Sequence, residues 1–135
     1  KRLKYDANDS AVNGGPHLVS GGRSAIQPVA DGLIQPEDPS FFLNWGIRRH
    51  PRTMAGIDRQ GRILLVTVDG RRPDYSVGLS LMDGSQLMIG LGAIEAINLD
   101  GGGSTAMVIN GKLVGSPSDP TGERAVGDAI IIKTK

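Results

Sequence analysis

Cysteine is absent from this chain of 135 residues, and aromatic residues make up only 4% of it. Without cysteine the chain cannot be a small module held together by disulfides. No apolar run reaches the ~18–20 residues that a transmembrane helix needs. Lys and Arg (15) nearly balance Asp and Glu (14), which leaves a net charge of +1. We therefore expect neither a nucleic-acid partner nor a membrane span.

Glycine is abundant instead: 20 glycines and 8 prolines form about a fifth of the chain, against an average nearer an eighth. The glycines have no strict period of three, which excludes collagen. Long helices tolerate few glycines, because each costs about 1 kcal/mol relative to alanine. The composition therefore predicts one compact domain, rich in strands and turns, that is long enough to bury about two thirds of its unfolded surface.

Two hairpins are predicted from local signals. Residues 53–58 and 62–69 are rich in apolar and β-branched side chains and flank a glycine turn, and the second of these strands should be buried. Asn110-Gly111 is the strongest two-residue turn signal in the chain. Further strands are predicted at residues 18–19, 93–99, 104–109, 112–114 and, as a buried closing strand, 129–132.

One helix is predicted, over residues 79–91. Ser80 is a plausible N-cap with Asp83 three residues later, and Gly90 and Gly92 provide the stop. Residues 24–46 contain three prolines and should form a long irregular loop. Because strands and helices do not alternate regularly, we expect an α+β fold with a mixed or mainly antiparallel sheet of six or seven strands and one principal helix.

The segment from Asp100 to Thr105 is the most conspicuous candidate site. Three successive glycines follow Asp100, and their N–H groups could converge on an anion. Ser104 and Thr105 would add hydroxyls to the same pocket. The alternative is a tight turn between two strands. The segment is neither a P-loop nor a dinucleotide fingerprint, because it lacks a Gly-Lys-Ser/Thr ending and no helix is predicted after it.

Two arginines and one further acid lie at the ends of predicted elements. Arg52 opens the first hairpin, Asp69 ends it, and Arg124 lies in the polar loop over residues 115–124. With Asp100 they could bind a phosphorylated substrate and perform acid–base chemistry. The alternatives are a solvated basic cluster around Arg52, ordinary turn chemistry at Asp69, and a local surface ion pair at Arg124.

Metal ligands are not evident in the sequence. His17 and His50 have no partner at a recognisable metal-ligand spacing, and the acidic loops lack EF-hand spacing. We therefore expect no metal and no cofactor. A calcium ion held by Asp and backbone oxygens remains the alternative.

Several segments resemble, in order, the motifs of the phosphodiester glycosidase domain family. The most specific are Asn-Leu-Asp-Gly-Gly-Gly-Ser-Thr-Ala at residues 98–106 and Pro-Arg-Thr at residues 51–53. Weaker matches are Gly-Gly-Pro-His-Leu-Val at 14–19, Val-Asp-Gly-Arg at 68–71, Gly-Leu-Ser-Leu at 78–81, Asn-Gly at 110–111, Pro-Ser-Asp at 117–119 and Glu-Arg at 123–124. The resemblance covers roughly residues 11–133.

The family domain is normally longer, with its own N-terminal portion. Residues 1–135 are therefore expected to be a single but incomplete domain, and part of the active site is expected on residues outside this sequence.

The resemblance implies hydrolysis of a sugar-1-phosphodiester, similar to an N-acetylglucosamine-1-phosphodiester, at its glycosidic bond. Asp100 is the first choice for base or nucleophile, with Asp69 second, and Arg52 would bind the phosphate with help from Arg124. The expected substrate-binding set is Thr53, Gly101, Gly102, Gly103, Ser104, Thr105, Ser118 and Arg124.

Two alternatives to this function stay open. The chain could be a non-catalytic phosphoglycan- or carbohydrate-binding or surface module, or one half of a split enzyme whose partner is its own N-terminal fragment. The resemblance also implies, weakly, an extracellular or cell-envelope location.

Overall fold

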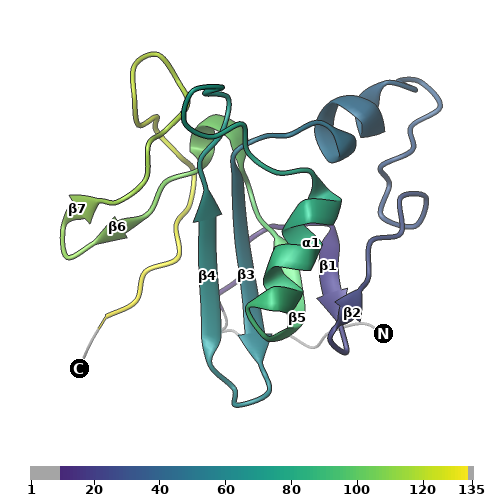
Figure 1. Cartoon of the computed structure of the whole chain (residues 1–135), viewed down its shortest axis with the longest axis horizontal. Coiled ribbons are helices and arrows are strands. Elements are labelled where there is room, and N and C mark those ends of the chain that lie inside the picture. The colour runs from purple at the N-terminus through teal and green to yellow at the C-terminus, as the bar shows by residue number, and fades with distance from the viewer. Residues whose placement is uncertain (1–9, 134–135) are drawn as a thin grey trace.

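Seven strands, in two antiparallel sheets, and one α-helix make up the part of the chain described by the computed structural model, residues 10–133. This confirms the predicted α+β class (Figure 1). The larger sheet has the order β2-β1-β5-β3-β4, and β6 pairs with β7 in the smaller one. The strands are β1 (His17–Ser20), β2 (Arg23–Ser24), β3 (Arg52–Asp58), β4 (Ile63–Val68), β5 (Ala93–Asn98), β6 (Val108–Ile109) and β7 (Lys112–Leu113). Residues 1–9 and 134–135 of the expected domain lie outside the described residues.

The helix α1 (Leu81–Gly90) begins where the sequence predicts. The Ser80 hydroxyl accepts a hydrogen bond from the Asp83 amide at 3.0 Å, and the Ser80 amide donates to the Asp83 carboxylate at 3.3 Å. These two bonds form a capping box, which satisfies main-chain donors that the first turn leaves free. The helix ends before Gly92, whose φ of +92° suits glycine.

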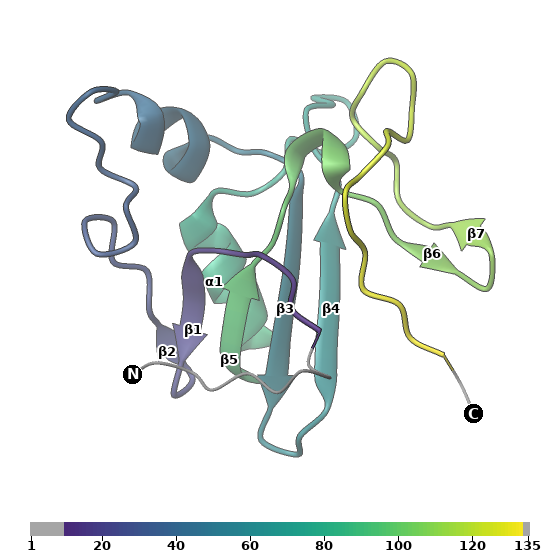
Figure 2. The same cartoon turned by 180° about the vertical axis from the view of Figure 1, so that it is seen from behind.

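The hydrophobic core lies between α1 and one face of the larger sheet. Its buried side chains come from β1, β3, α1, β5 and the loop before η1: Leu18, Val19, Leu33, Met54, Leu81, Met88, Ala93 and Ala96. Gly56 in β3 allows the helix to approach closely, because a Cβ there would lie 2.7 Å from Cε of Met88. The opposite face is crossed by the segment before β1, and the C-terminal segment runs down the β4 side of the sheet (Figure 2). None of the described helices is long and apolar enough to cross a membrane.

Residues 24–46 are irregular over most of their length, but their end is helical. The segment η1 (Phe42–Ile47) is a single π-helical turn, in which the Arg48 amide donates to the Leu43 carbonyl at 3.0 Å. Phe41 and Trp45 stack with ring centroids 5.9 Å apart and pack against the core. The sequence does not predict this turn, because aromatic packing rather than local propensity stabilises it.

Three predicted strands differ in the structure. Residues 129–132 form no strand, and Ile131 and Ile132 are 75% and 70% exposed; the prediction of a buried closing strand is wrong, since no described strand pairs with them. Of residues 104–109 only Val108 and Ile109 form a strand, and Ser104 lies in the 3₁₀ turn η2 (Gly102–Ser104). The strand β4 was expected to be buried, but it is an edge strand with Ile63 70% exposed.

Candidate functional site

Most of the predicted site residues meet at one end of the larger sheet. The strand β3 is antiparallel to both β4 and β5. The start of β3, the end of β4 and the end of β5 therefore lie at the same end of the sheet. They bring together Arg52, Thr53, Asp69 and Asp100. The turn η2 and the loop over residues 115–124 lie at this end too (Figure 1).

The three glycines after Asp100 form a turn that is bonded to the start of β3. The Gly102 amide donates to the Pro51 carbonyl at 2.9 Å, and the amides of Ser104 and Thr105 donate to the carbonyls of Gly101 and Gly102. The Gly102 amide is thus used inside the fold and is not turned toward a ligand. Both readings of this segment, a tight turn and a ligand-binding turn, remain compatible with this geometry.

Side chains from two loops lie against these glycines. A Cβ at Gly103 would overlap with the Arg124 guanidinium and the Asp119 carboxylate, so a larger residue there would have to displace this pair. Nε of Arg124 donates to Oδ2 of Asp119 at 2.7 Å. On the other side, Nη2 of Arg71 lies 3.0 Å from the place that a Cβ of Gly102 would occupy. Two arginines, one of them paired with an acid, therefore flank the turn.

The two candidate carboxylates have different surroundings. Asp69 is held firmly: Oδ1 accepts from the Ser116 amide at 2.9 Å, and Oδ2 accepts from the Tyr75 hydroxyl at 3.2 Å. Asp100 is exposed, and its carboxylate makes no hydrogen bond or ion pair with residues 10–133 that meets ordinary distance limits. Asp69 connects two loops, whereas Asp100 has no such partner among the described residues and can meet a ligand.

A groove of about 720 Å³ runs from this end of the sheet toward the C-terminal segment. Its polar end includes Thr53, Asp100, Ser104 and Arg124, and its apolar end includes residues of β4, β6 and the segment 129–132. Thr105 is buried behind it, with its hydroxyl 3.4 Å from that of Thr53. Ser118 Oγ is buried and has no hydrogen-bond partner in the described part of the chain. The groove can accept a ligand with both a polar and an apolar part.

Arg52 points away from the groove, on the α1 face of β3 with Met54. It is only 3% exposed. Its Nε donates to the Leu79 carbonyl at 2.9 Å, and its Nη2 donates to the Trp45 carbonyl at 2.6 Å. Its guanidinium carbon also lies 5.5 Å from the centre of the Trp45 ring. Burial lowers the pKa of Arg52 to about 10, so it stays positively charged at neutral pH. Its predicted role in phosphate binding stays a prediction.

Arg71, Tyr75, Ser116 and Asp119 contact the predicted site residues, although the sequence did not select them. The signal available for Arg71 was its place directly after Asp69-Gly70, and for Asp119 its place next to Ser118. No group of three or more His, Asp or Glu side chains between residues 10 and 133 is arranged to hold a metal ion. The calcium alternative stays untested.

Comparison with known proteins gives matches over most of the chain. The family model for phosphodiester glycosidase matches residues 1–133. A bovine N-acetylglucosamine-1-phosphodiester alpha-N-acetylglucosaminidase is 41% identical over 68 residues, which are 50% of this chain and 12% of that protein.

Solved structures are similar as well. A candidate exported protein of Burkholderia pseudomallei is 50% identical with a TM-score of 0.64, over 66% of this chain and 17% of that one. The catalytic domain of the zebrafish N-acetylglucosamine-1-phosphodiester alpha-N-acetylglucosaminidase is 28% identical with a TM-score of 0.64, over 78% of this chain and 34% of that one. The present chain therefore spans about a third or less of the length of these relatives.

Proposed function

Because the chain belongs to the phosphodiester glycosidase family, we propose that it acts on a sugar-1-phosphodiester of the N-acetylglucosamine-1-phosphodiester type and hydrolyses the glycosidic bond. The relatives named above act on this class of substrate by their names. The observation that carries the proposal is the exposed Asp100 carboxylate beside the triple-glycine turn, at the polar end of a groove.

The reaction needs a carboxylate that acts on water or on the sugar. Water attacks the anomeric carbon, the bond from that carbon to the phosphate oxygen breaks, and the phosphomonoester leaves with the bonding electrons. Asp100 accepts the proton of the attacking water, or it attacks the carbon itself and is then released by water. A carboxylate without hydrogen-bond or ion-pair partners is suited to either role, because no donor among residues 10–133 has to be displaced first.

Asp69 suits a positioning role better than a catalytic one. Each of its carboxylate oxygens already accepts one hydrogen bond, and its own carbonyl accepts another from the Ser76 hydroxyl at 2.6 Å. It therefore fixes the loop over residues 70–78 and the start of the loop over residues 115–124. Thr53 and Ser104 line the groove near Asp100 and can hydrogen-bond the sugar hydroxyls.

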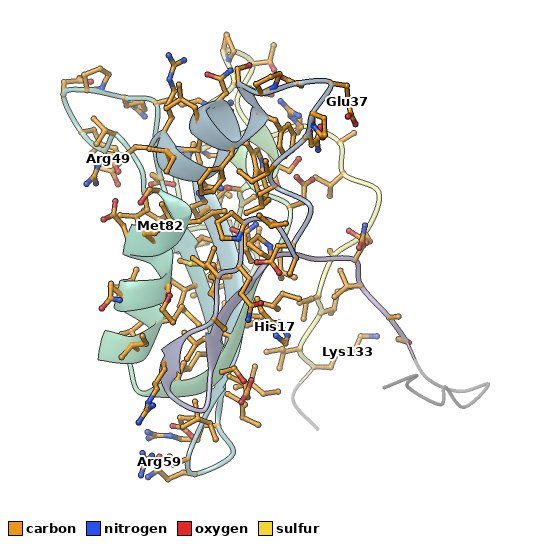
Figure 3. The ribbon with its side chains drawn as sticks, turned by 90° about the vertical axis from the view of Figure 1, so that its right-hand side faces the viewer. His17, Glu37, Arg49, Arg59, Met82 and Lys133 are labelled. Carbon is orange, nitrogen blue, oxygen red and sulfur yellow. The ribbon has the colours of Figure 1, made fainter. Side chains whose placement is uncertain are left out.

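Asp100→Asn tests the proposal directly. The amide keeps the shape of the side chain but cannot accept a proton, so turnover of a synthetic N-acetylglucosamine-1-phosphodiester should fall by about 10²–10⁴-fold. Glu37→Gln is the matched control, because Glu37 lies on the loop before η1, on the β1–β2 side of the sheet away from the groove (Figures 1 and 3). This control should keep the wild-type rate.

Two outcomes would count against catalysis by Asp100. A near-wild-type rate for Asp100→Asn would remove it from the mechanism. A wild-type protein that binds the phosphodiester in calorimetry but does not cleave it over hours would instead favour a phosphoglycan-binding module.

The exported relative from Burkholderia supports, in addition, the proposal that this protein is extracellular or in the cell envelope. Fractionation of source cells with an antibody to the chain would test this location. The predicted pairing with a separate N-terminal fragment remains a proposal, and the intact mass of the native protein would decide it.

A further inference from the structure

Three arginines at the end of the sheet where the groove begins are already engaged by other groups. Arg52 donates to the main-chain carbonyls of Leu79 and Trp45. Arg124 is paired with Asp119 at 2.6 Å. Arg72 donates to the Ser116 hydroxyl and lies over the Tyr75 ring, 5.4 Å from its centre. A guanidinium held by such contacts must give them up before it can bind an anion.

Arg71 differs from these three. It is exposed, and its guanidinium forms no ion pair within 4.0 Å in the described part of the chain. It lies directly over the triple-glycine turn, with Nη2 3.0 Å from the place of a Cβ on Gly102. Because Gly102 has no side chain, nothing separates this charge from the backbone of the turn that begins at Asp100.

The backbone of Arg71 is in an unfavourable conformation that maintains this placement. Its φ is +61°, in the left-handed region that non-glycine residues rarely adopt. Strain of this kind persists only where surrounding contacts impose it, and it is concentrated at functional sites. Here the preceding Gly70 is buried against Pro51 and Gly78, which fixes the turn, and the Arg71 amide bonds to the Val77 carbonyl.

We propose that Arg71 is the residue that binds the phosphoryl group of the substrate; this inference rests on the proposed function. The planar guanidinium can donate two parallel hydrogen bonds to phosphoryl oxygens. A phosphoryl group held over Gly102 places the adjoining sugar toward Asp100, which lies two residues earlier in the same turn. As the glycosidic bond breaks, negative charge grows on the departing phosphate, and Arg71 stabilises it.

Arg71→Gln tests this role with two probes, inorganic phosphate in calorimetry and an N-acetylglucosamine-1-phosphodiester in turnover. Loss of a charge-assisted pair of hydrogen bonds should weaken phosphate binding by about 10–100-fold and lower kcat/KM by at least as much. Arg59→Gln is the matched control. Arg59 is an exposed arginine at the opposite end of the sheet (Figure 3) and should leave both values unchanged.

A second variant, Arg71→Gly, separates binding from stability. Glycine accepts a φ of +61° without strain, so the melting temperature should stay the same or rise. Phosphate binding should nevertheless fall as far as in Arg71→Gln. A protein that melts normally but has lost the anion site shows that the effect is not caused by unfolding.

The two probes also distinguish failure of this inference from failure of the proposed function. Arg71-dependent phosphate binding without any turnover would support the anion site and refute the hydrolase. Turnover that depends on Asp100 but is unchanged in Arg71→Gln would support the hydrolase and overturn the role of Arg71. Unchanged phosphate affinity in both Arg71 variants would overturn it as well.

Discussion

Arg52 is a buried cation whose partners are main-chain carbonyl groups and an aromatic ring, and no acid lies within ion-pair distance of it in the described part of the chain. The Trp45 carbonyl belongs to η1, and the Leu79 carbonyl lies just before α1. One side chain therefore ties two helical segments to the first residue of β3. Carbonyls that lose such a donor inside the protein remain unsatisfied, and this is costly.

Arg52→Met should therefore reduce stability strongly. The substitution keeps an unbranched apolar stem but leaves both carbonyls without their donor, so we expect a loss of about 2–4 kcal/mol in the free energy of unfolding. Urea denaturation followed by circular dichroism measures it. Arg23→Met, on the exposed strand β2, is the control and should change stability little. Full stability with loss of phosphate affinity would instead support the ligand role that the sequence suggested.

At the scale of residues, the sequence selected Asp69 and Asp100 as candidates, and both lie at the same end of the sheet. The orientation and the partners of each side chain were not predicted. Asp69 and Asp100 follow apolar runs that predict strands. They were therefore expected where the chain leaves the sheet, which is a common place for site residues. Strict alternation with buried Met54 could have placed Arg52 on the α1 face. Its carbonyl partners depend on η1, whose conformation comes from long-range packing, so no local pattern could supply them.

At the scale of elements, the β3–β4 turn is organised by Asp58. Its Oδ1 accepts from the amides of Gln60 and Arg62 at 2.9 Å each, and its Oδ2 accepts from Nε of Arg62 at 2.6 Å. Burial raises the pKa of Asp58, but the hydrogen bonds from Arg62 and Gln60 and the charge of Arg62 outweigh it. The net result is a pKa below the ordinary value of 3.8.

This turn should make part of the stability of the protein depend on pH. A carboxyl group whose pKa is lower in the folded state stabilises the protein above its unfolded pKa, and this contribution disappears as the pH falls through the folded pKa. Asp58→Asn should therefore be less stable than the wild type at pH 7, and the difference should shrink below about pH 4. Urea denaturation at several pH values checks this. A difference that does not change with pH would contradict it.

Local signals explain which elements were predicted. The hairpin at Asn110-Gly111 forms because both residues adopt positive φ, 51° and 74°, which these residue types tolerate. The capping box of α1 is equally local. The segment 129–132 has strong β-branched character, but a strand also needs a neighbouring edge at the right distance. That requirement depends on the arrangement of the whole chain, so the pattern of these residues alone gave the wrong result.

At the scale of the whole molecule, the larger sheet has a covered face and an open edge. The face against α1 holds the core. The edge strand β4 has one row of main-chain donors and acceptors without a partner strand in the described residues. Ile63 at the start of β4 is 70% exposed. An apolar edge of this kind is a template for pairing with another strand.

The chain of 135 residues should therefore self-associate through β4 as its concentration rises. Ile63→Lys places a charge on the free edge and should shift the equilibrium toward the monomer. Sedimentation velocity over a concentration series measures the change. Val29→Lys adds the same charge on a loop outside the sheet, where the side chain is 80% exposed, and should not affect association. Equal association of both variants would show that another surface is responsible.

The β6–β7 hairpin gives the protein a convenient position for a reporter group. Asn110 at its tip lines the groove, and nearby Lys112 is exposed. Since the chain of 135 residues contains no cysteine, Lys112→Cys would carry the only thiol of this chain and could be labelled at one defined atom. A fluorophore there would lie beside the rim of the groove, in a hairpin separate from the larger sheet. Its emission would follow occupation of the groove in real time, including by ligands that are never cleaved.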